Sequence, residues 1–135
     1  MADQDPKNPD TPHTPRRTRL IRSFGYAFEG LAYTIRSQRN MRIHVTIAVL
    51  VVILGILARL TPLEWVALSI CMALVLVGEM LNTAIESMVD LITPEWHPLA
   101  KRAKDIGAGM VLLFALLSVV VGCFVFIPAL MRLFG

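Results

Sequence analysis

The chain has 135 residues, of which 56% are hydrophobic and 17% are charged. This length allows one domain, and the apolar content is too high for an ordinary soluble domain of this size. The formal net charge of +3 is unevenly distributed, because residues 16–42 carry seven arginines against Glu29 alone. Such a basic block favours an anionic membrane surface or a phosphorylated ligand. Nucleic acid is less favoured as a partner of this basic block, since no nucleic-acid-binding motif accompanies the charge.

The N-terminal segment differs in composition from the rest of the chain. Residues 1–15 are rich in Pro, Asp and Thr and contain no apolar stretch, so we expect a disordered tail without a cleavable signal sequence. From about Thr18 onward, apolar residues recur every three or four positions: Leu20, Ile21, Phe24, Phe28, Leu31 and Ile35. This spacing predicts an amphipathic helix over residues 18–38 that lies in the membrane interface. We expect residues 16–135 to form a single domain.

Three apolar segments follow, and each is long enough to cross a membrane. We predict spans over residues 43–60, 63–92 and 104–133. The predicted fold class is therefore an all-α membrane protein with three transmembrane helices and an N-terminal amphipathic surface helix. Positive charge gathers before the first span and again between the second and third, where it comprises Lys101, Arg102 and Lys104. This asymmetry predicts a cytoplasmic N-terminus and an external C-terminus.

The second predicted span carries the most informative feature of the chain. Four polar residues recur along it: Glu79, Asn82, Glu86 and Asp90. At about 100° per residue, they fall within one sector of roughly 80° of a helix. Ionisable groups inside a membrane helix are costly, so this stripe is a candidate functional site. Lys104-Asp105 follows after a short loop and extends the stripe into a compact cytoplasmic cluster.

Taken by themselves, these residues fit more than one activity. Phosphoryl transfer needs a group that accepts the acceptor's proton, ligands for Mg²⁺ and cations for the phosphates, and carboxylates suit the first two roles. The sequence contains neither a GxxxxGK[ST] nor a GxGxxG loop, so a nucleotide site would be built from helices. A non-enzymatic membrane protein whose carboxylate stripe conducts or senses cations is the alternative. A stripe that only holds helices together is the third possibility.

The stripe and the loop after it resemble a family signature. The segments Glu79–Asp90 (EMLNTAIESMVD) and Glu95–Asp105 (EWHPLAKRAKD) are similar to those of the prokaryotic diacylglycerol kinases. These are small three-span lipid kinases that include undecaprenol kinases. The resemblance runs from about Arg19 to the third span. It implies a homotrimer in the bacterial inner membrane, with active sites between subunits, that uses Mg²⁺ and ATP to phosphorylate a membrane lipid alcohol.

The resemblance also implies roles for individual residues. Glu79 corresponds to the catalytic base that contacts the lipid hydroxyl, Asn82 to an amide that shapes the site, and Glu86 to a metal ligand. Glu86 is also an implied nucleotide-binding position, and the others are Arg19, Tyr26, Gln38, Glu95, His97, Lys104 and Asp105. Arg19 is also implied in lipid binding, and we expect Trp65 to be an interfacial anchor that helps to line the lipid site.

One residue, Gln38, bears on the expected affinity for Mg²⁺. Gln38 stands where the family has a second metal-binding Glu. Because Gln offers only a neutral carbonyl oxygen, we expect a raised Mg²⁺ requirement rather than an inactive enzyme.

The segments Arg39–His44 and His97–Lys101 look more like the undecaprenol kinase branch, so undecaprenol is favoured over diacylglycerol. We expect His44 itself to lie at the membrane interface beside Arg42.

Overall fold

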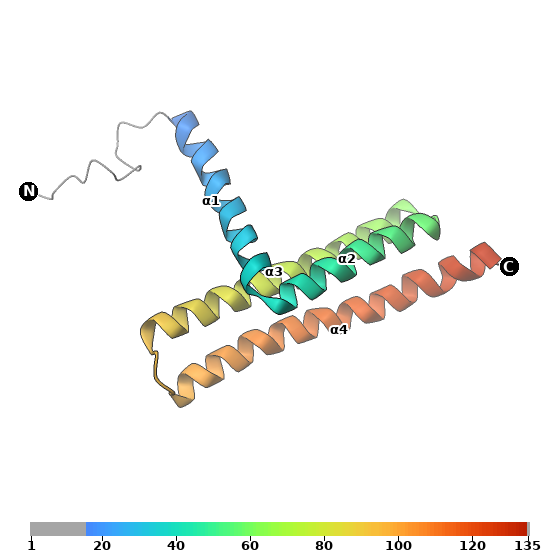
Figure 1. Cartoon of the computed structure of the whole chain (residues 1–135). Helices are drawn as coiled ribbons and strands as arrows, with labels where there is room; N and C mark the ends of the chain where they lie inside the picture. The colour runs from blue at the N-terminus through green and yellow to red at the C-terminus, as the bar shows by residue number, and fades with distance from the viewer. Residues whose placement is uncertain (1–15, 135) are drawn as a thin grey trace, which may run out of the picture. The chain divides into compact units, whose positions relative to one another are not determined.

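The computed structural model describes residues 16–134, with side chains from residue 20 onward, and this part of the chain contains four helices and no strand (Figure 1). The helices are α1 (Arg16–Ser37), α2 (Arg39–Leu57), α3 (Pro62–Ile92) and α4 (Pro98–Phe134). The last three are each long and apolar enough to cross a membrane, which confirms the predicted fold class. The predicted tail, residues 1–15, and the side chain of Arg19 lie outside the described residues.

The chain divides after Tyr33 into two compact units. In its described part, the first unit is the greater part of α1. Apolar side chains along this helix, such as Leu20, Phe24 and Phe28, are exposed. Exposed apolar residues on a helix rich in arginine are typical of a helix that binds a membrane surface.

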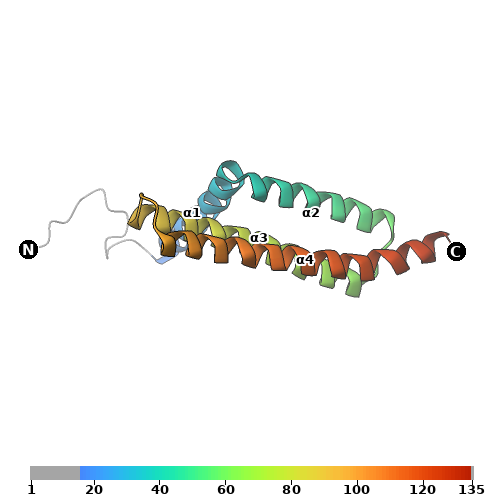
Figure 2. The ribbon, with the colours of Figure 1, turned by 90° about the horizontal axis from the view of Figure 1, so that it is seen from below.

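The second unit, residues 34–134, contains the three membrane helices. They run side by side and reverse direction at each connection (Figures 1 and 2). Helix α3 packs against α4 over much of its length and against α2 to a lesser extent. In the most apolar stretch of α3, 39% of residues are buried, against 11% in α2 and in α4. Helix α3 therefore forms the interior of the unit, and its buried face carries the polar stripe.

The turn between α2 and α3 fixes how these two helices align. Thr61 caps α3, because its main-chain N–H donates to the Glu64 carboxylate at 2.7 Å while its hydroxyl accepts from the Glu64 N–H at 3.5 Å. This is a capping box. Gly55 faces the Trp65 indole so closely that a Cβ there would lie 2.7 Å from the ring. A small apolar cluster beside the turn comprises Ala58, Leu60, Leu68, Val125 and Ala129.

Two helices begin earlier than the hydropathy pattern predicts. Helix α2 starts at Arg39 rather than 43, and α4 starts at Pro98 rather than 104. In α4 the added residues include the charged Lys101 and Arg102 and are nevertheless helical. The His97 Nδ1 accepts from the Leu99 N–H at 3.2 Å, which caps the helix. Pro98 at the first helical position also favours this start. Hydropathy identifies the stretch that enters lipid, whereas capping determines where the helix begins.

Candidate active site

Two residues of the stripe are deeply buried. Glu79 is 2% exposed and Asn82 is 7% exposed. Close approach of α3 and α4 at glycines contributes to the burial of Asn82. A Cβ added to Gly107 of α4 would lie 2.5 Å from the Asn82 Oδ1, and one added to Gly78 of α3 would lie 2.8 Å from the Phe114 ring. Small residues at such positions allow membrane helices to pack tightly.

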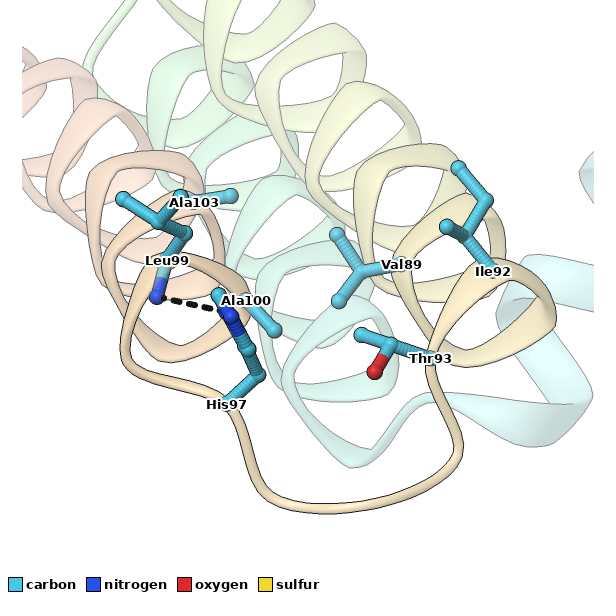
Figure 3. A pocket seen from close by; sticks show the side chains of 7 residues that line it. All are labelled: Val89, Ile92, Thr93, His97, Leu99, Ala100 and Ala103. Carbon is cyan, nitrogen blue, oxygen red and sulfur yellow. Dashed lines mark hydrogen bonds between the residues drawn. The ribbon is translucent and has the colours of Figure 1, made fainter.

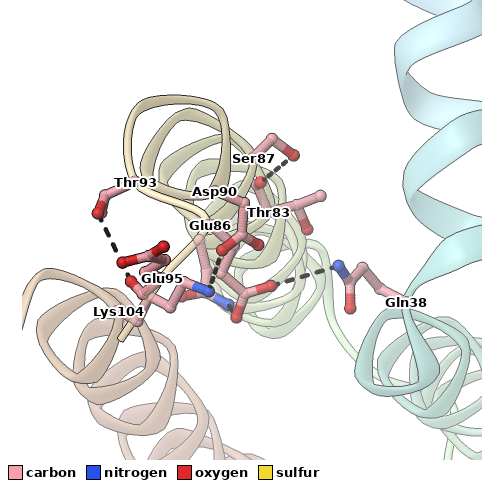
Figure 4. Close-up of polar contacts among 9 residues, drawn as sticks. Gln38, Thr83, Glu86, Ser87, Asp90, Thr93, Glu95 and Lys104 are labelled. Atoms are coloured by element: carbon pink, nitrogen blue, oxygen red, sulfur yellow. Dashed lines mark hydrogen bonds and ion pairs between the residues drawn. The ribbon is translucent and has the colours of Figure 1, made fainter. Parts of the chain in front are cut away.

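Glu86 is the centre of a short hydrogen-bond chain (Figure 4). The Asn82 Nδ2 donates to its Oε1 at 3.0 Å, and the Gln38 Nε2 faces its Oε2 at 3.4 Å. Gln38 occupies the extended break between α1 and α2, with φ −98° and ψ 122°. The structure therefore brings Gln38, Asn82 and Glu86 together from two parts of the sequence.

Glu79 has an ionisable neighbour on another helix. The His44 Nε2 of α2 lies 3.5 Å from the Glu79 Oε1. Sequence reasoning placed His44 at the interface and missed this contact. A signal was available, because His44 lies 17 residues before Thr61 and Glu79 lies 18 residues after it. In two antiparallel helices joined at that turn, residues equally far from the turn lie at the same height.

The end of α3 and the start of α4 form a second polar cluster. The Lys104 Nζ contacts the Asp90 Oδ1 at 2.5 Å, whereas Asp105 is paired with Lys101 at 2.6 Å. Lys104 and its neighbour Asp105 therefore have different partners, because adjacent residues point about 100° apart on a helix. The side chain of Lys104 in this cluster is drawn beside Asp90 in Figure 4.

Two open pockets flank the loop between α3 and α4. One has a volume of about 350 Å³, and its polar lining residues include Asp90, Glu95, His97, Lys104 and Asp105. The structure thus gathers four of the predicted nucleotide-binding residues around a single pocket. The other, of about 500 Å³, is mainly apolar and is shown in Figure 3. His97 lines both pockets.

Of the other predicted site residues, Trp65 is not brought into this arrangement, and Tyr26 and Arg19 belong to the first unit. Trp65 lies 14 residues before Glu79 on α3, about 21 Å along the helix, and packs at the far turn. Tyr26 belongs to the first unit, where its side chain is exposed. The side chain of Arg19 lies outside the described residues.

This arrangement suits proton transfer beside a phosphate-binding surface. A buried carboxylate with an imidazole neighbour can hold or accept a proton where water is scarce. Glu86, with an amide on either side, offers oxygen to a hard cation. Lys104 offers a cation to a phosphate at the mouth of the loop pocket. The three features occur in order from the interior of the unit toward the α3–α4 loop.

Comparison with known proteins finds relatives that align with most of the chain. The family model described as prokaryotic diacylglycerol kinase matches residues 25–126. The chain is 42% identical to an undecaprenol kinase of Bacillus subtilis, over 87% of this chain and 96% of the relative. It is 43% identical to a diacylglycerol kinase of Synechocystis, over 84% of this chain and 66% of the relative. It is 33% identical to a diacylglycerol kinase of Escherichia coli K12, over 78% of this chain and 87% of the relative.

Proposed function

Because the chain belongs to the prokaryotic diacylglycerol kinase family and is therefore a lipid kinase, we propose that it transfers the γ-phosphate of ATP to the hydroxyl of undecaprenol at the stripe of α3. The observation that carries this proposal is the buried Glu79 beside the hydrogen-bonded set of Asn82, Glu86 and Gln38. The relatives are kinases by name, so the cation pathway that the sequence also allowed is not proposed.

Glu79 is the proposed catalytic base. As the acceptor hydroxyl attacks the γ-phosphorus, a new oxygen–phosphorus bond forms and the bond to the bridging oxygen of ADP breaks. The proton of the hydroxyl passes to Glu79. At 2% exposure this carboxylate is shielded from bulk water, so a lipid hydroxyl is favoured over water as the acceptor. Excluding water in this way suppresses futile hydrolysis of ATP.

The donors around Glu86 fit a magnesium ion shared with phosphate. Mg²⁺ commonly takes one or two protein carboxylates and completes its coordination with water and phosphate oxygens. The described residues hold no cluster of three His, Cys, Asp or Glu side chains that would form an all-protein cage, and Glu86 with the Gln38 amide supplies the smaller donor set. When bound with ATP, Mg²⁺ would neutralise phosphate charge. We propose Glu86 and Gln38 as its protein ligands.

We place the nucleotide at the polar pocket beside the α3–α4 loop. Lys104 is the proposed phosphate contact, and its pairing with Asp90 keeps the ammonium in place until phosphate arrives. Asp105, Glu95 and His97 line the same pocket. The resemblance to the family adds Arg19 and Tyr26 of α1 to the proposed nucleotide-binding set, with Arg19 also contacting the lipid.

The proposed acceptor is undecaprenol. The Bacillus relative is named for this lipid, while relatives of comparable or lower identity are named for diacylglycerol. The segments Arg39–His44 and His97–Lys101 favour the first branch. Trp65, near the opposite end of α3, is proposed to anchor the chain in the membrane interface and to line the path of the lipid chain.

We further propose a homotrimer with active sites between subunits, in the bacterial inner membrane. Helices α2 and α4 leave most of their apolar surface uncovered, which is available to lipid and to further copies of the chain. With the N-terminus cytoplasmic and the C-terminus outside, alkaline phosphatase fused after the last residue is expected to be active. An inactive fusion would contradict this topology.

The direct test is transfer of labelled γ-phosphate from Mg-ATP by the purified full-length chain. Undecaprenol and diacylglycerol are offered side by side in mixed micelles. Glu79→Gln is expected to abolish the product, whereas Glu64→Gln, a matched change near the other end of α3, is expected to retain it. Undiminished product from Glu79→Gln would refute the assignment of the base. Preferential labelling of diacylglycerol would refute the proposed acceptor.

A further inference from the structure

We propose that His44 is a positioning residue that orients Glu79 for catalysis. This inference rests on the proposed role of Glu79 as the base. The His44 Nε2 and the Glu79 Oε1 lie 3.5 Å apart, with side chains that are 20% and 3% exposed. The two residues come from adjacent antiparallel helices and lie at nearly the same distance from the turn that joins them, 17 residues before Thr61 and 18 after it. Because His44 and Glu79 lie at a similar height along the two helices, their contact follows from the way in which α2 and α3 are aligned.

Glu79 needs a donor because its carboxylate is buried. A carboxylate removed from water is stable only when hydrogen-bonded or paired. In the part of the chain that the structure describes, His44 is the basic side chain that contacts Glu79. The contact is longer than a formed hydrogen bond, and catalytic hydrogen bonds commonly shorten once substrate is bound.

The polar side chains next to Glu79 on α3 already have other partners. The Thr83 hydroxyl donates to the main-chain oxygen of Glu79 at 2.8 Å rather than to its carboxylate. The Asn82 amide donates to Glu86. The donor for Glu79 must therefore come from a different helix, and His44 of α2 is in position to supply it.

The surroundings of His44 strengthen this role. His44 lines an otherwise mainly apolar groove of about 360 Å³ between α2, α3 and α4, with Ile47, Val51 and Val75 among its other lining residues. In apolar surroundings an N–H to carboxylate interaction is stronger than in water. With Oε1 held by the His44 Nε2–H, the Oε2 of Glu79 is left to accept the proton of the acceptor hydroxyl.

The test uses substitutions that place a donor at different depths. The Nε2 of Gln stands about as far from the backbone as the Nε2 of His, so it can replace that donor. The Nδ2 of Asn corresponds instead to the Nδ1 of His, and Phe has no donor. We expect His44→Gln to keep kcat within about threefold of the unmodified chain, while His44→Asn and His44→Phe lose roughly 10- to 100-fold, as for one hydrogen bond to a charged group. The KM values for ATP and lipid are expected to change by less than about twofold, because the contact does not involve either substrate.

The controls separate this inference from the proposed function. Thr46→Val removes a hydroxyl that bonds only within α2, to the Arg42 carbonyl at 2.8 Å, and is expected to leave kcat unchanged. Full kcat in His44→Phe, or equal loss in the Gln and Asn variants, would overturn the inference. If Glu79→Gln is inactive while His44→Phe is fully active, only the proposed role of His44 is refuted. If Glu79→Gln is active, the proposed role of Glu79 as the base is refuted together with that of His44.

Discussion

Substituting Gly107 by alanine tests the packing that places Asn82. A Cβ at this position would lie 2.5 Å from the Asn82 Oδ1, 3.5 Å from its Cγ and 3.6 Å from the Ile85 Cδ1. The first distance is about 1 Å shorter than an ordinary van der Waals contact. Asn82 is 7% exposed and has little room to move. Either its amide turns away from Glu86 or α4 moves away from α3.

The expected losses of stability and of kcat follow from the packing and the hydrogen bond that the added Cβ would disturb. Overpacking of this kind costs roughly 1–3 kcal/mol. Loss of the Asn82 hydrogen bond to the Glu86 carboxylate, now 3.0 Å, is worth about 1.5–3 kcal/mol. If this loss is expressed in catalysis, kcat falls by roughly 10- to 100-fold. The higher helix propensity of alanine offsets at most about 1 kcal/mol of the destabilisation.

The assay compares Gly107→Ala with Gly109→Ala, a matched change on the same helix. An added Cβ at Gly109 meets nothing within 4 Å, so it gains the same helix propensity without the clash. We expect reduced kcat and a lower midpoint of thermal unfolding in detergent for Gly107→Ala alone. Equal behaviour of the two variants would show that α4 does not press on Asn82, and this account of the site would be wrong.

Three further predictions concern other parts of the molecule. Gln38→Glu should lower the half-saturating Mg²⁺ concentration by roughly tenfold, since a second carboxylate faces the cation; a Mg²⁺ titration of activity measures it. Lys104→Ala should raise the KM for ATP by roughly tenfold, because a phosphate loses its cation, while kinetics of Arg102→Ala serve as the control. Glu64→Ala should lower the thermal midpoint and leave kcat unchanged, because Glu64 caps α3 and pairs with Arg132 far from Glu79.

Each of these predictions has an outcome that contradicts it. An unchanged Mg²⁺ requirement in Gln38→Glu would remove Gln38 from the proposed metal ligands. Similar KM values for Lys104→Ala and Arg102→Ala would mean that the nucleotide phosphates lie elsewhere. For Glu64, the comparison is with Glu64→Gln, which keeps a capping acceptor but weakens the pair with Arg132. Loss of activity in either Glu64 variant would contradict the separation of stability from catalysis along α3.

Some contacts of the site follow from helix geometry alone. Asn82 and Glu86 are four residues apart, so they meet on any α-helix. The same periodicity assigns Glu79 to the same face. It also places the side chains of Lys104 and Asp105 about 100° apart, in agreement with their separate partners in the structure, Asp90 and Lys101. Hydropathy located the three spans, but not the capped and charged first turns of α4.

The sequence by itself determined the all-helical membrane fold and the stripe on α3, because both depend on regular local periodicity. Counting residues from the turn at Thr61 predicts that His44 and Glu79 lie at a similar height, but only the tertiary structure decided which side chains of other helices meet the stripe. The contact of His44 with Glu79 and that of Gln38 with Glu86 depend on the register of α2 against α3. That register is set by the capped turn at Thr61 and by the close packing of Gly55 on Trp65. Contacts between distant residues require the helices to be aligned in space, and local periodicity carries no information about that alignment.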